Sequence, residues 1–363
     1  MARRIMKTSS TTTTTTTTTT WCVLLSVLVF LAILDVTNGF SGIGGRSAAK
    51  FQRQPQQQQP HAASFDLFGR LRHRTGLPIV AEQSTATKST RLQALPAGLG
   101  EAIPVLASSL FRYGGHVPFS QALALNVVLF AGLRTKLLKM LTTEGFFHAL
   151  ALATGLWTTL GWRGWTTCVL YLFLGSAVTK VKFQEKEKMG IAEGRGGRRG
   201  PENVWGSAAT GLACAIASAR GPTFLGIPSD LYLLGYVASL ATKLSDTFAS
   251  EIGKAYGKTT FLITTLERVA PGTEGAVSAE GTAASVVGGT LISLFGCWAV
   301  KFISPKAVPI SIFAAFVATN IESVLGATLQ GKKNLEWMTN EVVNFINTLI
   351  GAVVAIGCGM LFL

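Results

Sequence analysis

The chain has 363 residues, of which 48% are hydrophobic and 14% are charged, and its formal net charge is +14 at pH 7. Soluble domains average about 25% charged residues, so this composition argues against a soluble enzyme. The 39 glycines fit a polytopic helical membrane protein, in which small residues let helices approach closely. No two of the five cysteines have zinc or redox spacing, so the sequence supports neither a disulfide framework nor a zinc site.

The positive charge is concentrated near the N-terminus. Residues 1–95 hold eleven Lys and Arg against three acids, which accounts for +8 of the net charge of +14. Because most of the basicity lies in this leader, the charge does not indicate a nucleic-acid partner.

The leader has the composition of two targeting signals in series. Its apolar run at 21–34 is shorter than the roughly 20 residues of a membrane span and is typical of a signal peptide. Residues 40–95 are basic, poor in acids and rich in Ser and Thr, as transit peptides are. With Phe40 at the junction, the leader resembles the bipartite plastid leaders of algae with red-lineage secondary plastids. We predict a signal peptide at 1–39, a plastid transit peptide or disordered linker at 40–95, and an integral membrane domain at 96–363. The alternative is a signal anchor followed by a disordered linker.

From residue 117 onward, long apolar segments alternate with polar loops. We predict an all-α, polytopic transmembrane bundle of seven or eight spans, in which the short segment 231–244 is the weakest. The predicted spans are 117–133, 145–160, 165–181, 203–219, 231–244, 282–300, 309–329 and 341–363.

The loop charges support eight crossings. The loops 134–144, 182–202, 245–281 and 330–340 would share one side and together hold 14 Lys and Arg, whereas the opposite loops hold four. Positive loops stay on the side from which a protein is inserted, which in a plastid is the stroma. The two loops richest in polar motifs are therefore expected on the stromal side.

The first of these loops, 193–203, interleaves glycines with Arg195, Arg198 and Arg199. Guanidinium groups match phosphate oxygens bidentately, and glycines let backbone N–H groups approach an anion. These three arginines are candidates for phosphate binding. A solvated positive loop is the alternative, and it alone accounts for Lys182, Lys186 and Lys188.

The second loop places two polar stripes on a predicted helix over 245–258. Asp246, Ser250, Gly253 and Gly257 share one face, and Thr247, Glu251, Lys254 and Lys258 share the adjacent one. Asp246 and Glu251 are candidate Mg²⁺ ligands and catalytic residues, because Mg²⁺ takes one or two carboxylates together with substrate phosphates. Ser250, Lys254 and Lys258 are candidates for nucleotide binding. A tight helix-packing seam is the alternative for the first stripe.

A third motif, over 271–282, places Gly272, Thr273 and Gly275 just before a predicted helix. Such a turn at a helix N-terminus attracts phosphate, although ordinary turn and capping chemistry explains it equally well. Two later groups of polar residues lie in apolar segments and are candidates either for interhelical hydrogen bonds or for lining the same site. They are Asn320, Glu322, Ser323, Asn340, Glu341, Asn344 and Asn347.

Several strings resemble a known family over roughly residues 100–363. They are RRGPENVWGSAATG at 198–211, LSDTFASEIGKAYGKT at 244–259, GTEGAVSAEG at 272–281, ATNIES at 318–323 and NEVVNFINT at 340–348. Together they resemble the plant and algal phytyl-phosphate kinases of vitamin E synthesis. A shorter pattern from Asp246 to Gly253 is similar to the CTP-dependent polyprenol kinases.

The resemblance implies a multi-pass kinase of a plastid membrane, with the envelope as the expected location. It would use a nucleoside triphosphate, with CTP the expected donor, and Mg²⁺ to convert phytyl phosphate to phytyl diphosphate for tocopherol and phylloquinone synthesis. Two alternatives remain open: another CTP-dependent lipid enzyme, such as a prenol kinase or a lipid cytidylyltransferase, and a non-enzymatic membrane carrier.

Overall fold

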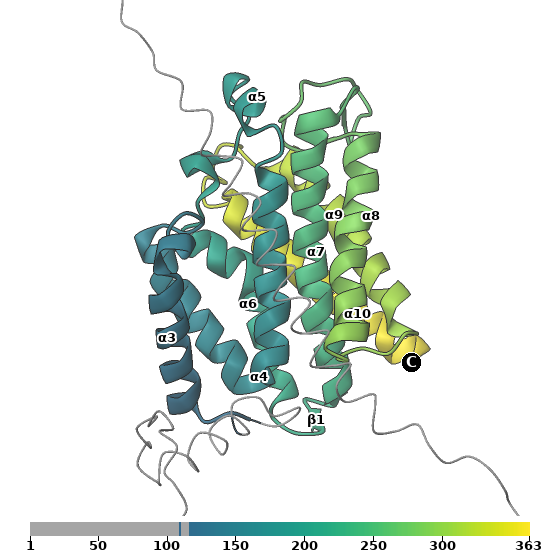
Figure 1. The fold of residues 1–363 in the computed structure, drawn as a ribbon. Helices are drawn as coiled ribbons and strands as arrows, with labels where there is room; N and C mark the ends of the chain where they lie inside the picture. Colours follow the sequence, from purple (N-terminus) through teal and green to yellow (C-terminus); the bar gives the residue numbers. More distant parts are fainter. Residues whose placement is uncertain (1–108, 110–115) are drawn as a thin grey trace, which may run out of the picture.

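The computed structural model describes Ser109 and residues 116–363, so the predicted leader segments 1–39 and 40–95 lie outside the described residues. The described part is a helical bundle, as predicted (Figure 1). Its helices are α3 (Phe119–Leu137), α4 (Thr143–Thr179), α5 (Phe183–Lys188), η1 (Gly194–Gly197), α6 (Pro201–Ser218), α7 (Ser229–Tyr256), α8 (Ala279–Leu294), η2 (Phe295–Ala299), α9 (Ala307–Leu329) and α10 (Asn340–Phe362). Its strands form two short antiparallel hairpins, β1 (Thr223–Phe224) with β2 (Ile227–Pro228) and β3 (Phe261–Leu262) with β4 (Ala276–Val277).

Helix α4 is bent back on itself at Gly161. The backbone N–H of Thr142, which caps α4, donates to the carbonyl oxygen of Arg199 at 3.0 Å, and the hydroxyl of Tyr171 accepts from the Arg199 guanidinium at 2.5 Å. A straight helix would separate Thr142 from Tyr171 by about 40 Å, so the two halves must reverse direction. Gly161 makes the break with φ 64° and ψ −158°, a conformation open to glycine but not to other residues. The segments 145–160 and 165–181 thus form one hairpin.

Helix α7 is the centre of the bundle and packs against α4, α6, α8, α9 and α10. All residues from Leu234 to Thr247 are buried. A helix that other helices enclose on all sides has no lipid-facing side. Polar residues can therefore follow directly after the apolar run of 231–244. The segment predicted as the weakest span is therefore part of the most enclosed helix, which runs unbroken through 245–256.

Three helices in the described part are long and apolar enough to cross a membrane: Ala279–Ala299, Ala307–Leu329 and Asn340–Phe362. The first joins α8 to the π-helical turn η2. The seven or eight crossings therefore stay a prediction.

Glycines allow α8 to lie directly on the backbone of α7. A Cβ atom at Gly288 would sit 2.8 Å from the carbonyl oxygen of Leu244, closer than real contacts allow. Gly357 on α10 is a useful contrast, since a Cβ there would meet nothing within 4 Å.

We therefore expect Gly288→Ala to destabilise the protein and Gly357→Ala to leave it unchanged or slightly stabilised. Both changes raise helix propensity by about 0.5–1 kcal/mol, but forcing α7 and α8 apart costs about 1–3 kcal/mol. Thermal unfolding in detergent, followed by size-exclusion chromatography of the heated samples, measures the difference. Equal unfolding midpoints for the two variants would contradict direct α7–α8 backbone contact.

Candidate active site

A polar cavity of about 190 Å³ lies at the end of the bundle where α6, α8 and α10 begin. Its walls come from the loops 182–202 and 245–281 and from α6, α7, α9 and α10, so the two motif-rich loops meet at one place. Eight ionisable side chains line it: Glu193, Arg199, Lys243, Asp246, Glu251, Lys254, Glu274 and Glu322. The lining therefore holds five carboxyl groups and three cationic groups.

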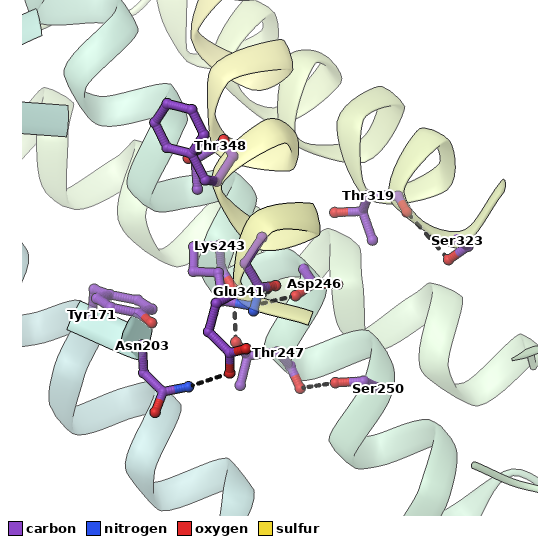
Figure 2. Close-up of polar contacts among 12 residues, drawn as sticks. Tyr171, Asn203, Lys243, Asp246, Thr247, Ser250, Thr319, Ser323, Glu341 and Thr348 are labelled. Atoms are coloured by element: carbon purple, nitrogen blue, oxygen red, sulfur yellow. Dashed lines mark hydrogen bonds and ion pairs between the residues drawn. The ribbon is translucent and has the colours of Figure 1, made fainter. Parts of the chain in front are cut away.

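Lys243 and Asp246 form a buried ion pair on α7. The Nζ of Lys243 lies 2.5 Å from Oδ2 of Asp246 and donates to Oδ1 of Asn344 on α10 at 2.6 Å (Figure 2). Only 9% and 11% of the two charged side chains are exposed. A buried charge is tolerated only when it is paired and hydrogen-bonded, so this trio fixes Asp246 at the cavity wall. The sequence analysis did not single out Lys243. Its position three residues before Asp246 was a usable signal, because side chains at that spacing on a helix can pair.

Glu322 of α9 brings a second carboxyl group to the wall occupied by Asp246. Both carboxyl groups line the cavity. Asn320 and Ser323 of the same helix also line the cavity. The sequence left open whether these polar residues form interhelical hydrogen bonds or line the site. The structure places them in the lining of the cavity.

Glu251 lines the cavity, but Oε2 of its carboxylate is bound by the Nζ of Lys186 in α5. Lys186 is completely buried and also donates to the carbonyl oxygen of Thr179 at 2.9 Å. The interpretation of Lys186 as a solvated loop residue was therefore wrong. The pair joins α5 to α7 across 65 residues, a separation at which the sequence gives no local signal.

The three arginines of the 193–203 loop lie in different places. Arg199 lines the cavity, its guanidinium lies over the ring of Tyr171, and its backbone is held by Met140 and Thr142. Arg195 pairs with Glu202 and donates to Asn203, and Arg198 is exposed; neither is among the residues that line the cavity.

Glu202 is the exposed partner of Arg195. Partial burial acts to raise the pKa of Glu202, but hydrogen bonds from its own backbone N–H and from Arg195, and the charge of Arg195, lower the pKa below its usual value. This pair therefore stabilises the loop and the start of α6 at the surface.

The two stripes predicted over 245–258 are divided between the cavity and helix packing. Asp246, Ser250 and Lys254 line the cavity, whereas Lys258 is exposed and is not among the lining residues. A Cβ at Gly257 would lie 3.0 Å from the hydroxyl of Ser278. The first stripe thus lines the cavity at Asp246, Ser250 and Gly253 and packs against α8 at Gly257.

The turn at 272–275 lies at the mouth of the cavity. Gly272, Thr273 and Gly275 all line it, and both glycines have positive φ, at 86° and 75°. The N–H and hydroxyl of Thr273 bind the carbonyl oxygen of Ala270, and Ser278 caps α8 by accepting from the N–H of Gly281 at 3.1 Å. The hydrogen bonds of a turn and of a helix cap are therefore both present in this segment, which lines the cavity.

The start of α10 completes the wall. Asn340 and Asn344 line the cavity, and Asn347 is fully buried below them. Glu341 accepts a 3.0 Å hydrogen bond from Asn203 of α6, which lines the cavity too (Figure 2). Asn203 was quoted in a motif but was not singled out as a site residue.

A second, apolar cavity of about 150 Å³ adjoins the polar one. It lies between α3, the α4 hairpin and α6, and Arg199, Asn203 and Ser207 line both cavities. Its remaining walls are mostly aliphatic and aromatic side chains: Leu129, Phe130, Leu133, Leu137, Leu141, Ala149, Leu152, Ala153, Leu156, Trp165, Cys168, Val169, Tyr171, Leu172, Phe173, Val204 and Ala208.

Among Ser109 and residues 116–363, no cluster of three or more His, Cys, Asp or Glu side chains could hold a metal ion unaided. Mg²⁺ does not need one, because it binds through one or two carboxylates, waters and substrate phosphates. The oxygen donors at Asp246, Glu322 and the neighbouring hydroxyls fit that requirement.

Comparison with known proteins agrees with this architecture. A family model described as integral membrane protein DUF92 matches residues 126–352. This chain belongs to the DUF92 family of integral membrane proteins. Its membrane-embedded character follows from the family and from the three apolar helices. No solved structure matches the chain.

Proteins similar to this chain come from Synechocystis, Arabidopsis thaliana and Methanocaldococcus jannaschii. The chain is 53% identical to an uncharacterized membrane protein of Synechocystis over 253 residues, which are 69% of this chain and 95% of the relative. It is 42% identical to Protein VTE6, chloroplastic, of Arabidopsis thaliana over 241 residues, 66% of this chain and 71% of that one. An uncharacterized membrane protein of Methanocaldococcus jannaschii is 32% identical over 186 residues, 51% of this chain and 72% of the relative. The family predicted from the motifs is confirmed by the VTE6 and DUF92 matches.

The Lys186–Glu251 pair makes a prediction about stability. Lys186→Met and Glu251→Gln should each lower the free energy of unfolding by about 3–5 kcal/mol, because each leaves one buried charge unpaired. The double variant should regain most of that loss, and Glu202→Gln in the exposed Arg195 pair should cost less than about 1 kcal/mol. Chemical unfolding in detergent tests this. Single variants as stable as Glu202→Gln would show that the buried pair does not form.

Proposed function

We propose that this protein is a plastid-membrane kinase of the phytyl-phosphate type, with CTP the expected phosphate donor. The observation that carries the proposal is the polar cavity at the end of an apolar bundle, lined from the motif strings at 198–211, 244–259, 272–281, 318–323 and 340–348. The similarity to chloroplastic VTE6 supports the kinase-type activity and the plastid setting. The positive loops support a stromal orientation of the site, and the envelope is the membrane we propose.

A metal ion would help this cavity to hold two phosphate groups together. Carboxyl groups outnumber cations among the lining residues, and Lys186 offsets only the charge of Glu251. Asp246 and Glu322 would hold Mg²⁺, with Glu251 the ligand expected from the sequence alone. The ion would offset the charge of the phosphate oxygens that meet there.

The transfer itself requires little covalent chemistry from the protein. An oxygen of phytyl phosphate attacks the terminal phosphorus of the triphosphate, the bond from that phosphorus to the bridging oxygen breaks, and the nucleoside diphosphate leaves with the bridging oxygen. A phosphate monoester has its second pKa near 6, so the attacking oxygen is already deprotonated at neutral pH and needs no general base.

The lining residues would therefore position and neutralise their substrates. Lys254 and Arg199 are cations that can contact phosphate oxygens, whereas Lys243 is engaged by Asp246 and Asn344 and would act by holding both in place. The 272–275 turn and the N-terminus of α8 offer backbone N–H groups and a partial positive charge to the donor phosphates.

The activity is tested with the purified chain in detergent, supplied with Mg²⁺, phytyl phosphate and CTP, UTP, ATP or GTP. We expect phytyl diphosphate and the nucleoside diphosphate, detected by mass spectrometry. Asp246→Asn should reduce the rate at least about 100-fold, the scale at which one electrostatic contact to a transition state acts. Asp230→Asn, at the opposite end of α7, should keep it.

Other products would overturn the assignment. Phosphorylation of phytol itself would indicate a prenol kinase, and a CDP-lipid with pyrophosphate would indicate a cytidylyltransferase. Flux of a lipid phosphate across liposomes without nucleotide, unaffected by Asp246→Asn, would indicate a carrier.

The metal site makes a separate prediction. Chelation of divalent ions should abolish activity and Mg²⁺ should restore it. Glu322→Gln should raise the half-saturating Mg²⁺ concentration by about tenfold or more, the usual scale for weakening a metal site. Glu251→Gln should raise it less, because that carboxylate is bound by Lys186. A larger shift for Glu251→Gln would assign the ion to Glu251 instead.

A further inference from the structure

We propose that the apolar cavity between α3, the α4 hairpin and α6 holds the isoprenoid tail of the acceptor, with Arg199 binding its phosphate where the two cavities join. The proposal rests on the proposed function, because it assumes a lipid phosphate as acceptor. It assigns the tail to one place in the bundle and the selection of chain length to the residues that line it.

The cavity is apolar where a hydrocarbon chain would lie and polar at one end only. Apart from Trp165, Tyr171 and the three shared residues, its walls carry no side-chain hydrogen-bond donor stronger than a thiol. On α3 the lining residues recur at Leu129, Leu133 and Leu137, which places them on one face of the helix over about 12 Å. A continuous apolar wall of this length fits an extended chain better than a compact ligand.

The junction has the chemistry of a phosphate site. Arg199 lines both cavities, beside Asn203 and Ser207. Its backbone is fixed by hydrogen bonds with Met140 and Thr142 and its side chain by Tyr171, so the cation is held in place before any ligand binds. A phosphate at Arg199 would face Asp246 and Lys254 across the polar cavity and leave its tail among the leucines.

The outer wall is suited to entry from the bilayer. Helix α3 packs chiefly against α4, and its other side exposes Phe119, Val127 and Val128. A lipid tail could therefore enter beside α3 without crossing a polar surface, whereas the nucleotide would enter from the loops.

Ala153 and Ala151 give a matched pair for testing this. Both lie on the first half of α4, but Ala153 is buried and lines the apolar cavity, whereas Ala151 is exposed on the outer face. Ala153 lies about 16 Å along α4 from Thr142, which contacts Arg199. A leucine at position 153 would therefore obstruct the far part of a long tail more than a short one.

The experiment compares phytyl phosphate (C20) with geranyl phosphate (C10) as acceptors. Ala153→Leu should lower the C20 to C10 ratio of kcat/KM by about tenfold or more, since a change of one methylene in an apolar pocket already counts for about that much. Ala151→Leu should leave the ratio unchanged. Equal losses for both acceptors in a folded Ala153→Leu protein would overturn the proposal.

Labelling the wild-type chain tests the cavity without turnover. A phytyl phosphate analogue with a diazirine at the end of its tail should label residues of α3, α4 or α6 that line the apolar cavity, and excess phytyl phosphate should displace it. Labelling elsewhere, or equal labelling by a diazirine phosphatidylcholine that phytyl phosphate does not displace, would overturn the assignment.

The two measurements separate the failure of this proposal from the failure of the kinase assignment. Displaceable labelling of the cavity-lining residues of α3, α4 or α6 without diphosphate formation would keep the tail site and reject the kinase. Diphosphate formation with labelling elsewhere would keep the kinase and reject the tail site.

Discussion

The burial of charged side chains on α7 is the constraint on which the rest of the site depends. Lys243 and Asp246 lie on a stretch that is enclosed from Leu234 to Thr247. An unpaired ion there would cost several kcal/mol, so neighbouring helices must supply partners. Asn344 of α10 does so directly, and Glu322 of α9 lines the same cavity. The polar starts and ends of otherwise apolar helices follow from that requirement.

The ends of the surrounding helices add to the electrostatics of the same cavity. Helices α6, α8 and α10 all begin there, and each N-terminus carries roughly half a positive charge. These fixed dipoles offset part of the excess of carboxylates without adding mobile lysines. The proposed metal–nucleotide complex, which carries charges of both signs, would meet both kinds of partner in this cavity.

The sequence predicted the helical bundle, most helix positions and the two motif-rich loops on one side. Asp246, Ser250, Lys254 and Arg199, which it named as candidates from local spacing and glycine patterns, line the cavity, and their roles stay a prediction. It did not predict the partners of Glu251 or Lys243, since those contacts join residues 65 and 101 positions apart. It also grouped Arg195 and Arg198 with Arg199, because composition cannot show which arginine of a loop turns inward.

The two cavities meet at Arg199, so the part of the 193–203 loop around this residue has to be held in place. Met140 and Thr142 bind both sides of the Arg199 backbone, and the bend at Gly161 brings Tyr171 back to the same point. Helices α3, α4 and α6 are thereby joined at the boundary between polar and apolar surface. An amphipathic acceptor requires such a boundary to be fixed, because its phosphate must meet a polar reactant while its tail stays out of water. The hairpin of α4 would therefore contribute to the proposed reaction although it lies outside the motif strings.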